Sequence, residues 1–215
     1  HIQFIIEEMV PGHVETFDGV TDSQKNILIS TSHVMLNSIM DNVNEASDTA
    51  FYSQPVEGLD LAEIGKKAVD AFQAKSRFFH FEFFRLDEDR EGLGKKGDIV
   101  GLEVNMRAPG AYMPDMTNYA YDVDVYTIWA DMIKFDQCYY DLHREYWVAY
   151  TGRRDGIWYA HNYDQIRAKY GDMIALETDV PEALAAAMGN HVFITKAHTQ
   201  EELFEQIRYI LKRED

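Results

Sequence analysis

Basic residues are scarce in this sequence. Twenty lysines and arginines stand against 37 aspartates and glutamates, which gives a formal net charge of −17 at pH 7. The longest basic cluster is GKKG, at residues 94–97, and it has the composition of a solvated loop. A chain this acidic is repelled by nucleic-acid backbones and by anionic lipids unless a basic patch overrides the net charge. We therefore expect neither nucleic acid nor a membrane surface as a partner.

Cysteine and long apolar runs are almost absent. The single cysteine, Cys138, excludes a disulfide within the chain, and we interpret it as a buried small side chain because no histidine or asparagine partner pattern accompanies it. No apolar run approaches the roughly 20 residues of a membrane-spanning helix. The opening residues, HIQFIIEEMV, lack the basic and apolar regions of a signal peptide. These absences predict a cytoplasmic protein.

The first residues have the pattern of a strand interior. Residues 3–6 are mostly apolar and β-branched, which is typical of a strand, and no initiator methionine precedes them. We therefore expect the sequence to be the carboxyl-terminal part of a longer protein.

Hydrophobic residues make up 46% of the 215 residues and aromatic residues 13%, a composition that can bury a core. Alternating runs predict strands, and apolar spacings of three and four predict helices. Strands are expected over residues 3–6, 14–20, 26–34, 76–86, 98–107 and 191–197, with a strand, turn and strand over 145–161. Helices are expected over residues 60–75, 115–135 and 198–212.

These elements predict an α+β fold with a mostly antiparallel sheet. Residues 76–86 and 98–107 should form a hairpin, because the loop between them is short enough and contains three glycines, Gly92, Gly94 and Gly97. A boundary near Phe135 would divide the chain into residues 1–135 and 136–215.

Two of the expected helices carry capping signals. Asp60 and Glu63 are spaced as a capping box, and so are Thr199 and Glu202. The helix over 115–135 is expected to pack through an apolar stripe made by Val123, Tyr126, Trp129, Ala130 and Ile133.

The segment GLEVNMRAPG, residues 101–110, places three polar groups at alternate positions of a strand. Residues two apart in a strand share a face, so Glu103, Asn105 and Arg107 should project together. A half-solvated strand with its polar side chains toward water produces the same pattern. The choice between the two interpretations depends on the neighbouring strand.

That neighbour, FFHFEFF, carries Glu82 among aromatic side chains, and an unpaired carboxylate there would cost several kcal/mol. We expect Glu82 to join Glu103 and Asn105 across the two strands. Two carboxylates and a carboxamide oxygen suit Mg²⁺ or Mn²⁺, and Arg107 could neutralise a phosphoryl group beside them. Five histidines lack metal-ligand spacing and are interpreted as structural: His80, His143, His161, His191 and His198.

Three segments, in this order, resemble the carboxyl-terminal half of the ATP-grasp fold: FIIEEMVPGHVE, FFHFEFF and GLEVNMRAPG. This superfamily of carboxylate-amine ligases includes biotin carboxylase, D-alanine-D-alanine ligase and the carbamoyl phosphate synthase large subunit. Its members have a strand that ends in an acidic hinge, a second strand with Asp or Glu, and a third with Glu-x-Asn, often followed by Arg and Pro-Gly. The resemblance extends to about Phe135.

The resemblance implies a nucleotide site. Adenine would be bound by Glu7, by the backbone at Glu8 and Val10, and by Leu102 beneath its ring, while Glu15 would accept hydrogen bonds from the ribose.

The resemblance also implies roles for the polar strand residues. Glu82, Glu103 and Asn105 would bind one or two Mg²⁺ that bridge the terminal phosphates of ATP. Arg107 would be catalytic and would steady the γ-phosphate or an acyl-phosphate intermediate. The amino-terminal lobe, with its phosphate-contacting lysines and Gly-rich flap, has no counterpart before His1.

The implied function is that of an ADP-forming ligase, related to carbamoyl phosphate synthase-like and amino-acid ligase-like members. It would use ATP and Mg²⁺, or Mn²⁺, to join a small carboxylate to an amine or a thiol. The 215-residue chain alone is expected to bind nucleotide weakly and to be inactive. A non-catalytic binding or regulatory module and a purely structural α+β domain are the alternatives, and assembly into a homo-oligomer is left open.

Overall fold

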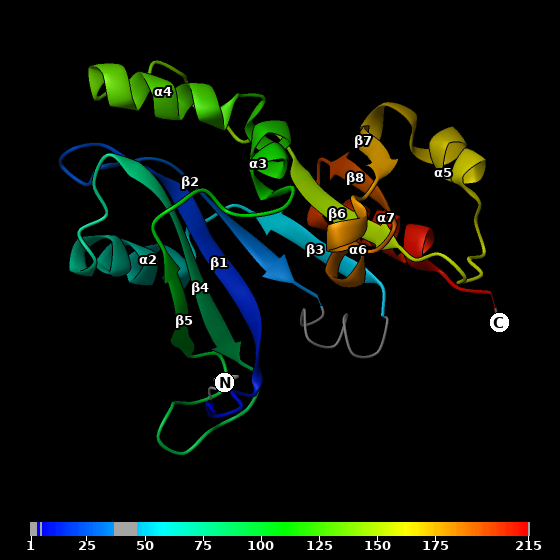
Figure 1. The fold of residues 1–215 in the computed structure, drawn as a ribbon, viewed down its shortest axis with the longest axis horizontal. Helices are drawn as coiled ribbons and strands as arrows, with labels where there is room; N and C mark the ends of the chain where they lie inside the picture. Colours follow the sequence, from blue (N-terminus) through cyan, green and yellow to red (C-terminus); the bar gives the residue numbers. More distant parts are fainter. Residues whose placement is uncertain (1–3, 5, 37–46, 215) are drawn as a thin grey trace.

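The computed structural model describes residues 4, 6–36 and 47–214 (Figure 1). The strands are β1 (Gly12–Thr21), β2 (Ile27–Met35), β3 (Thr49–Gln54), β4 (Arg77–Leu86), β5 (Ile99–Asn105), β6 (Trp147–Arg153), β7 (Ile174–Asp179) and β8 (His191–Ala197). The α-helices are α2 (Asp60–Ala71), α3 (Met113–Tyr121), α4 (Val125–Phe135), α5 (Tyr163–Tyr170), α6 (Glu182–Met188) and α7 (Gln200–Leu211).

These strands form one sheet in the order β5-β4-β1-β2-β3-β6-β8-β7, and every neighbouring pair is antiparallel. The predicted fold class, α+β with a mostly antiparallel sheet, is confirmed. β3 pairs with β6, with Tyr52 opposite Ala149. The sheet therefore continues across Phe135, so the proposed parts 1–135 and 136–215 share it.

Successive side chains of β4 point to opposite faces of the sheet, and a hydrophobic core cluster lies on each face. Phe79 and Phe81 pack with Leu61 of α2 on one face. Phe78 packs with Met116 of α3 and Ile128 of α4 on the other. Cys138 is half-buried and packs against the same cluster as Phe78.

The helix predicted over residues 115–135 is two helices, because the backbone turns between them. Asp122 ends α3 with a φ of 51°, in the left-handed region. The side chain of Asp124 then accepts a hydrogen bond from the backbone nitrogen of Tyr126, at 3.0 Å, and begins α4. The turn explains why α3 and α4 take different directions in Figure 1.

The expected apolar stripe of this segment was also wrong. α4 buries Val125, Ile128 and Met132. Trp129 is 39% exposed and Ile133 is 56% exposed. The buried residues have the same spacing of three and four but lie one position earlier along the chain, so the neighbouring face of α4 packs on the core.

The two predicted capping boxes had opposite outcomes. Thr199 and Glu202 form the expected box at the start of α7. The residue before α2 is Leu59, which makes no side-chain cap. Asp60 is the first residue of α2 and instead accepts two hydrogen bonds from Arg85, at 2.8 and 3.1 Å. Its carboxylate therefore ties α2 to β4 and forms no capping box.

Some predicted strands are missing, and some elements were not predicted. In the segment 3–6, residues 3 and 5 lie outside the described residues, while Phe4 and Ile6 are in no strand and are 85% and 96% exposed. The second strand expected within 145–161 is only a single bridge between Tyr159 and Arg213. The prediction missed β3, β7, α5 and α6. None of the described helices combines the length and apolarity that crossing a membrane requires.

Candidate functional site

The hairpin of β4 and β5 brings the predicted metal ligands together. Glu82 lies opposite Glu103, and His80 lies opposite Asn105. Residues directly opposite in an antiparallel pair project from the same face. Leu102 is the extra residue where the register shifts beside Glu82, and its side chain is 44% exposed. The structure therefore brings the two carboxylates and the carboxamide to one face of two adjacent strands.

A series of hydrogen bonds links Glu82 to three buried residues, His80, Asp18 and His33. His80 Nε2 lies 2.9 Å from Glu82 Oε1, and His80 Nδ1 lies 2.5 Å from Asp18 Oδ1. The other oxygen of Asp18 lies 2.8 Å from His33 Nδ1. Asp18, His33 and His80 are each at most 4% exposed. This arrangement fixes the direction of the Glu82 carboxylate, because its partner is itself held in the core.

The hydrogen bonds among Asp18, His80 and Glu82 favour the charged forms of His80 and Asp18. Burial disfavours the imidazolium of His80, but the hydrogen bonds to Asp18 and Glu82 outweigh burial and raise its pKa to about 9. Burial likewise opposes ionisation of Asp18, yet hydrogen bonds from His33 and His80 lower the pKa of Asp18 below its ordinary value. At neutral pH an imidazolium therefore lies between two carboxylates.

A cavity of about 200 Å³ opens beside this face. His80, Glu82 and Arg107 line it together with an apolar set. The apolar residues come from β2, β3, α3, α6 and the loops beside them: Met35, Ala50, Phe51, Ala111, Met113, Ala187 and Met188. Arg107 is exposed and donates one hydrogen bond to the carbonyl of Ala108, at 2.9 Å. The cavity thus combines the cations of His80 and Arg107 and one candidate metal carboxylate with apolar walls.

The donors on this face fit a hard divalent cation. Carboxylate and carboxamide oxygens are the ligands that Mg²⁺ prefers, and Mg²⁺ usually keeps several positions for water or phosphate. Asn105 is half-buried, and its Nδ2 has no hydrogen-bond partner among the described residues. A metal would use the oxygen of this carboxamide. The same residues contain no group of three or more His, Cys, Asp or Glu side chains arranged as a metal site. A metal here would therefore have few protein ligands.

Apart from Leu102 in β5, the predicted adenine residues lie in the irregular segment before β1. Glu7 and Glu8 are exposed and Val10 is half-buried. Glu8 pairs with Arg90 at 2.8 Å, and the backbone of Asp87 donates to the carbonyl of Pro11 at 3.0 Å. The segment therefore runs beside the loop that joins β4 to β5.

Glu15 lies on the opposite face of the sheet from Glu82. It pairs with Phe83, whereas its neighbour Thr16 pairs with Glu82. Arg85 donates to both of its carboxylate oxygens, at 2.7 and 2.9 Å. The ribose contact of Glu15 stays a prediction, and it would have to be shared with Arg85.

The sequence prediction missed the supporting residues behind Glu82. His80 was interpreted as structural because it lacks metal-ligand spacing, and Asp18 and His33 were not singled out. The available signal was Asp18 in a strand of mostly apolar and β-branched residues, since a buried carboxylate needs a partner. The partners come from two other strands, so only the strand order identifies them.

Comparisons with protein-family models and with curated proteins found no match. Solved structures do match. A phosphoribosylglycinamide synthetase from Anaerococcus prevotii has a TM-score of 0.61 at 14% identity, over 95% of this chain and 52% of its own. An L-amino acid ligase from Bacillus licheniformis has a TM-score of 0.67 at 12% identity, over 93% of this chain and 52% of its own.

A third match is an N5-carboxyaminoimidazole synthase from Aspergillus clavatus, in complex with ADP and 5-aminoimidazole ribonucleotide. Its TM-score is 0.55 at 15% identity, over 93% of this chain and 50% of its own. The chain thus spans about half the length of these solved structures. The antiparallel sheet and its helices match part of the ATP-grasp fold, which is the fold that the sequence predicted.

Proposed function

We propose that this protein is an ATP-dependent ligase, in which the described chain supplies the metal and nucleotide half of the active site. The ligase would join a small carboxylate to an amine or a thiol and release ADP and phosphate. One observation carries the proposal: Glu82 and Glu103 lie opposite each other beside a cavity that Arg107 also lines. Two of the matching structures support it, because one holds ADP and another is an L-amino acid ligase.

Glu82, Glu103 and Asn105 would hold the metal, Mg²⁺ or Mn²⁺. When bound, the metal would supply positive charge against the terminal phosphates of ATP. His80 would hold the Glu82 carboxylate in one direction, because it engages Oε1. A fixed ligand loses less entropy on binding a metal than a free side chain does.

The nucleotide would extend from this face toward the start of β1. Glu7, Glu8, Val10 and Leu102 would surround adenine. A ribose contact by Glu15 would require the nucleotide to reach the opposite face of the sheet from Glu82 and to share the carboxylate with Arg85.

The reaction would proceed in two steps. An oxygen of the substrate carboxylate attacks the γ-phosphorus of ATP, and the bond to the β-phosphate oxygen breaks, which releases ADP. Arg107 would stabilise the negative charge on the transferred phosphoryl group. The amine or thiol then attacks the carbonyl carbon of the acyl phosphate, loses its proton, and displaces phosphate. The protein would act mainly by positioning the reactants.

The walls of the cavity favour a carboxylate with an apolar part. Phe51, Met113 and Met188 are at most 8% exposed and line it, and its charged residues are the site residues His80, Glu82 and Arg107. A substrate would place its carboxylate toward Arg107 and its apolar part against these side chains.

A second candidate is a nucleotide-binding module without turnover. Two observations favour it: the chain spans about half of the matching structures, and Arg85 occupies both oxygens of Glu15. Such a module would bind Mg·ATP and release no ADP.

Magnesium-dependent ADP release by the full-length protein tests the proposal, with a panel of small carboxylates and amines. We expect Glu103→Ala to abolish release, and Glu88→Ala, in the exposed loop after β4, to leave it unchanged. Release that survives Glu103→Ala would refute the metal assignment. Binding of Mg·ATP without release would favour the module. A micromolar dissociation constant for ATP with the 215-residue chain alone would contradict the idea that it is half of a site.

A further inference from the structure

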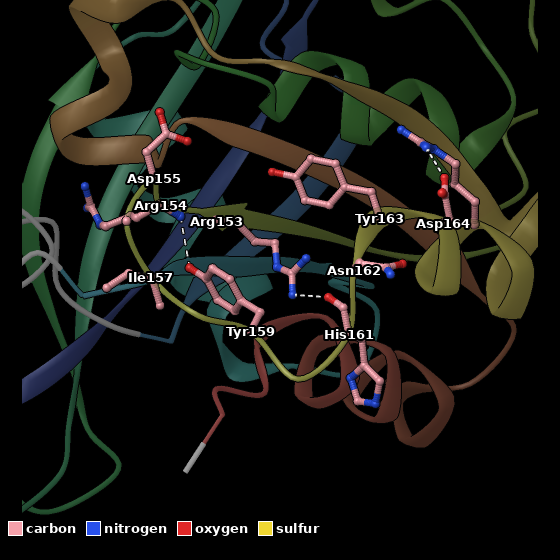
Figure 2. A pocket seen from close by; sticks show the side chains of 11 residues that line it. Arg153, Arg154, Asp155, Ile157, Tyr159, His161, Asn162, Tyr163 and Asp164 are labelled. Carbon is pink, nitrogen blue, oxygen red and sulfur yellow. Dashed lines mark hydrogen bonds and ion pairs between the residues drawn. The ribbon is translucent and has the colours of Figure 1, made fainter.

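A second cavity, of about 560 Å³, lies at the end of β6 (Figure 2). Arg153, the last residue of β6, lines it. Phe51 lines the cavity beside Glu82, whereas its neighbour Tyr52 faces the other way, opposite Ala149. Arg153 shares the face of Ala149 because the two are four residues apart in one strand. The second cavity therefore belongs to the opposite face of the sheet from the proposed active site.

Arg153 is buried, and within the described part of the chain it forms no ion pair with a carboxylate. Its side chain is near the centre of Figure 2, and the residue is 2% exposed. The Cζ atom lies 3.9 Å from the ring centre of Tyr159 and 5.5 Å from that of Tyr163. Nη2 donates to the carbonyl of His161 at 2.6 Å, and Nε has no hydrogen-bond partner within the described ranges. In the same ranges no carboxylate lies within ion-pair distance of this guanidinium.

The other arginines of this cavity are already satisfied. Arg167 pairs with Asp164 at 2.8 Å and with Glu177 at 2.5 Å. Arg154 donates to the backbone carbonyls of Ala185 and Ala186, among others. Arg153 is thus a buried cation of this cavity without an ion pair among the described residues, and the Asp48 carboxylate offsets its charge only from beyond ion-pair distance.

Burial alone does not make an arginine a binding site. Arg144 is half-buried, but its guanidinium lies 5.6 Å from the ring centre of Tyr121 and 5.9 Å from that of Trp147, and it donates to Ser53. Arg153 differs because it borders an open cavity. A buried cation costs free energy unless an anion or hydrogen bonds offset it. Burial accordingly lowers the pKa of Arg153 below its ordinary value.

We propose that the cavity around Arg153 binds the carboxylate or phosphate group of a small molecule. The guanidinium matches a planar or tetrahedral oxyanion with paired hydrogen bonds. Asn162 and Tyr163 line the same cavity and add neutral polar groups, and the volume is in the range of small-molecule sites. This site is separate from the ligase reaction, so its ligand would be an effector or a second substrate group.

An NMR titration of the full chain, without ATP or metal, tests this site. Sodium acetate and inorganic phosphate are the two probes, and sodium chloride at equal ionic strength is the reference. We expect saturable chemical-shift changes over residues 153–167 with at least one probe and none with chloride. The stronger probe then tells whether the natural ligand carries a carboxylate or a phosphate.

Two neighbouring residues provide matched variants. Ile157 lines the cavity, so Ile157→Trp should fill it and weaken binding at least tenfold while Arg153 stays in place. Trp158 is 80% exposed and does not line the cavity, so Trp158→Ala should bind as the parent does. Arg153→Met should also lose binding, and Ile157→Trp decides the matter if Arg153→Met does not fold. Absence of saturable shifts with both probes, or binding that survives Ile157→Trp, would overturn the proposal whatever the outcome of the ADP assay.

Discussion

His80 Nε2 lies 2.9 Å from Oε1 of Glu82, so a buried imidazole holds the carboxylate that we assign to the metal. Partners behind a ligand orient it, and their loss typically lowers metal affinity by about 10- to 100-fold. We expect His80→Gln to weaken Mn²⁺ binding by roughly this factor, as measured by electron paramagnetic resonance. His143→Gln is the control, because His143 is exposed. Equal Mn²⁺ affinity in His80→Gln and the parent would show that His80 is only structural.

The raised pKa of His80 predicts how stability depends on pH. The folded pKa of about 9 exceeds the ordinary value of 6.5, so protonation favours the folded state. The stabilisation is complete below about pH 6.5 and is lost as the pH rises through about 9. In metal-free buffer, we expect the free energy of unfolding to fall by roughly 3 kcal/mol across this window. Urea unfolding at several pH values measures the fall, and His80→Gln should flatten the curve; an equal slope in both proteins would contradict the assignment.

The ion pair between half-buried Arg85 and buried Glu15 should stabilise the folded state. The side chains are 21% and 7% exposed, and two hydrogen bonds join them. Arg85→Met leaves a buried carboxylate without its partner, which typically costs about 3–5 kcal/mol. Lys67→Met is the matched control, because Lys67 pairs with Glu63 on the surface of α2, and it should cause no measurable loss. Urea unfolding that gives equal losses for the two variants would contradict this account of Glu15.

The break between α3 and α4 also allows a direct test. Asp122 has a φ of 51°, which glycine adopts without strain and a β-branched residue adopts with difficulty. Asp122→Gly should be neutral or stabilise the protein, whereas Asp122→Val should destabilise it by about 1–2 kcal/mol. Thermal unfolding checks both variants. Tolerance of valine would indicate one continuous helix in solution.

The placement of Glu82, Glu103 and Asn105 on one face followed from local sequence patterns and could therefore be predicted from the sequence. Alternation puts Glu103 and Asn105 on one face, and the short loop between β4 and β5, which contains three glycines, makes the hairpin depend on nearby residues only. The register then places Glu82 opposite Glu103. Thr199 and Glu202 were likewise predicted, because a capping box lies within four residues.

Features that depend on distant residues were not predicted. β3 pairs with β2 and with β6. The residues of β6 lie about 100 positions further along the chain, and no local pattern near Thr49–Gln54 predicts the pairing with them. The role of Asp60 changed because Arg85 reaches it from β4. The same reason applies to His80, whose partner Asp18 lies on another strand.

Paramagnetic broadening by Mn²⁺ in NMR spectra of the full chain tests the central claim most directly. The account predicts that low Mn²⁺ concentrations broaden the amide signals around residues 80–82 and 103–105 first. It also predicts that Glu82→Gln and Glu103→Gln each reduce the effect, while signals around Arg153 on the opposite face stay sharp. Broadening centred elsewhere, or unchanged by both substitutions, would contradict a metal site on the β4–β5 hairpin.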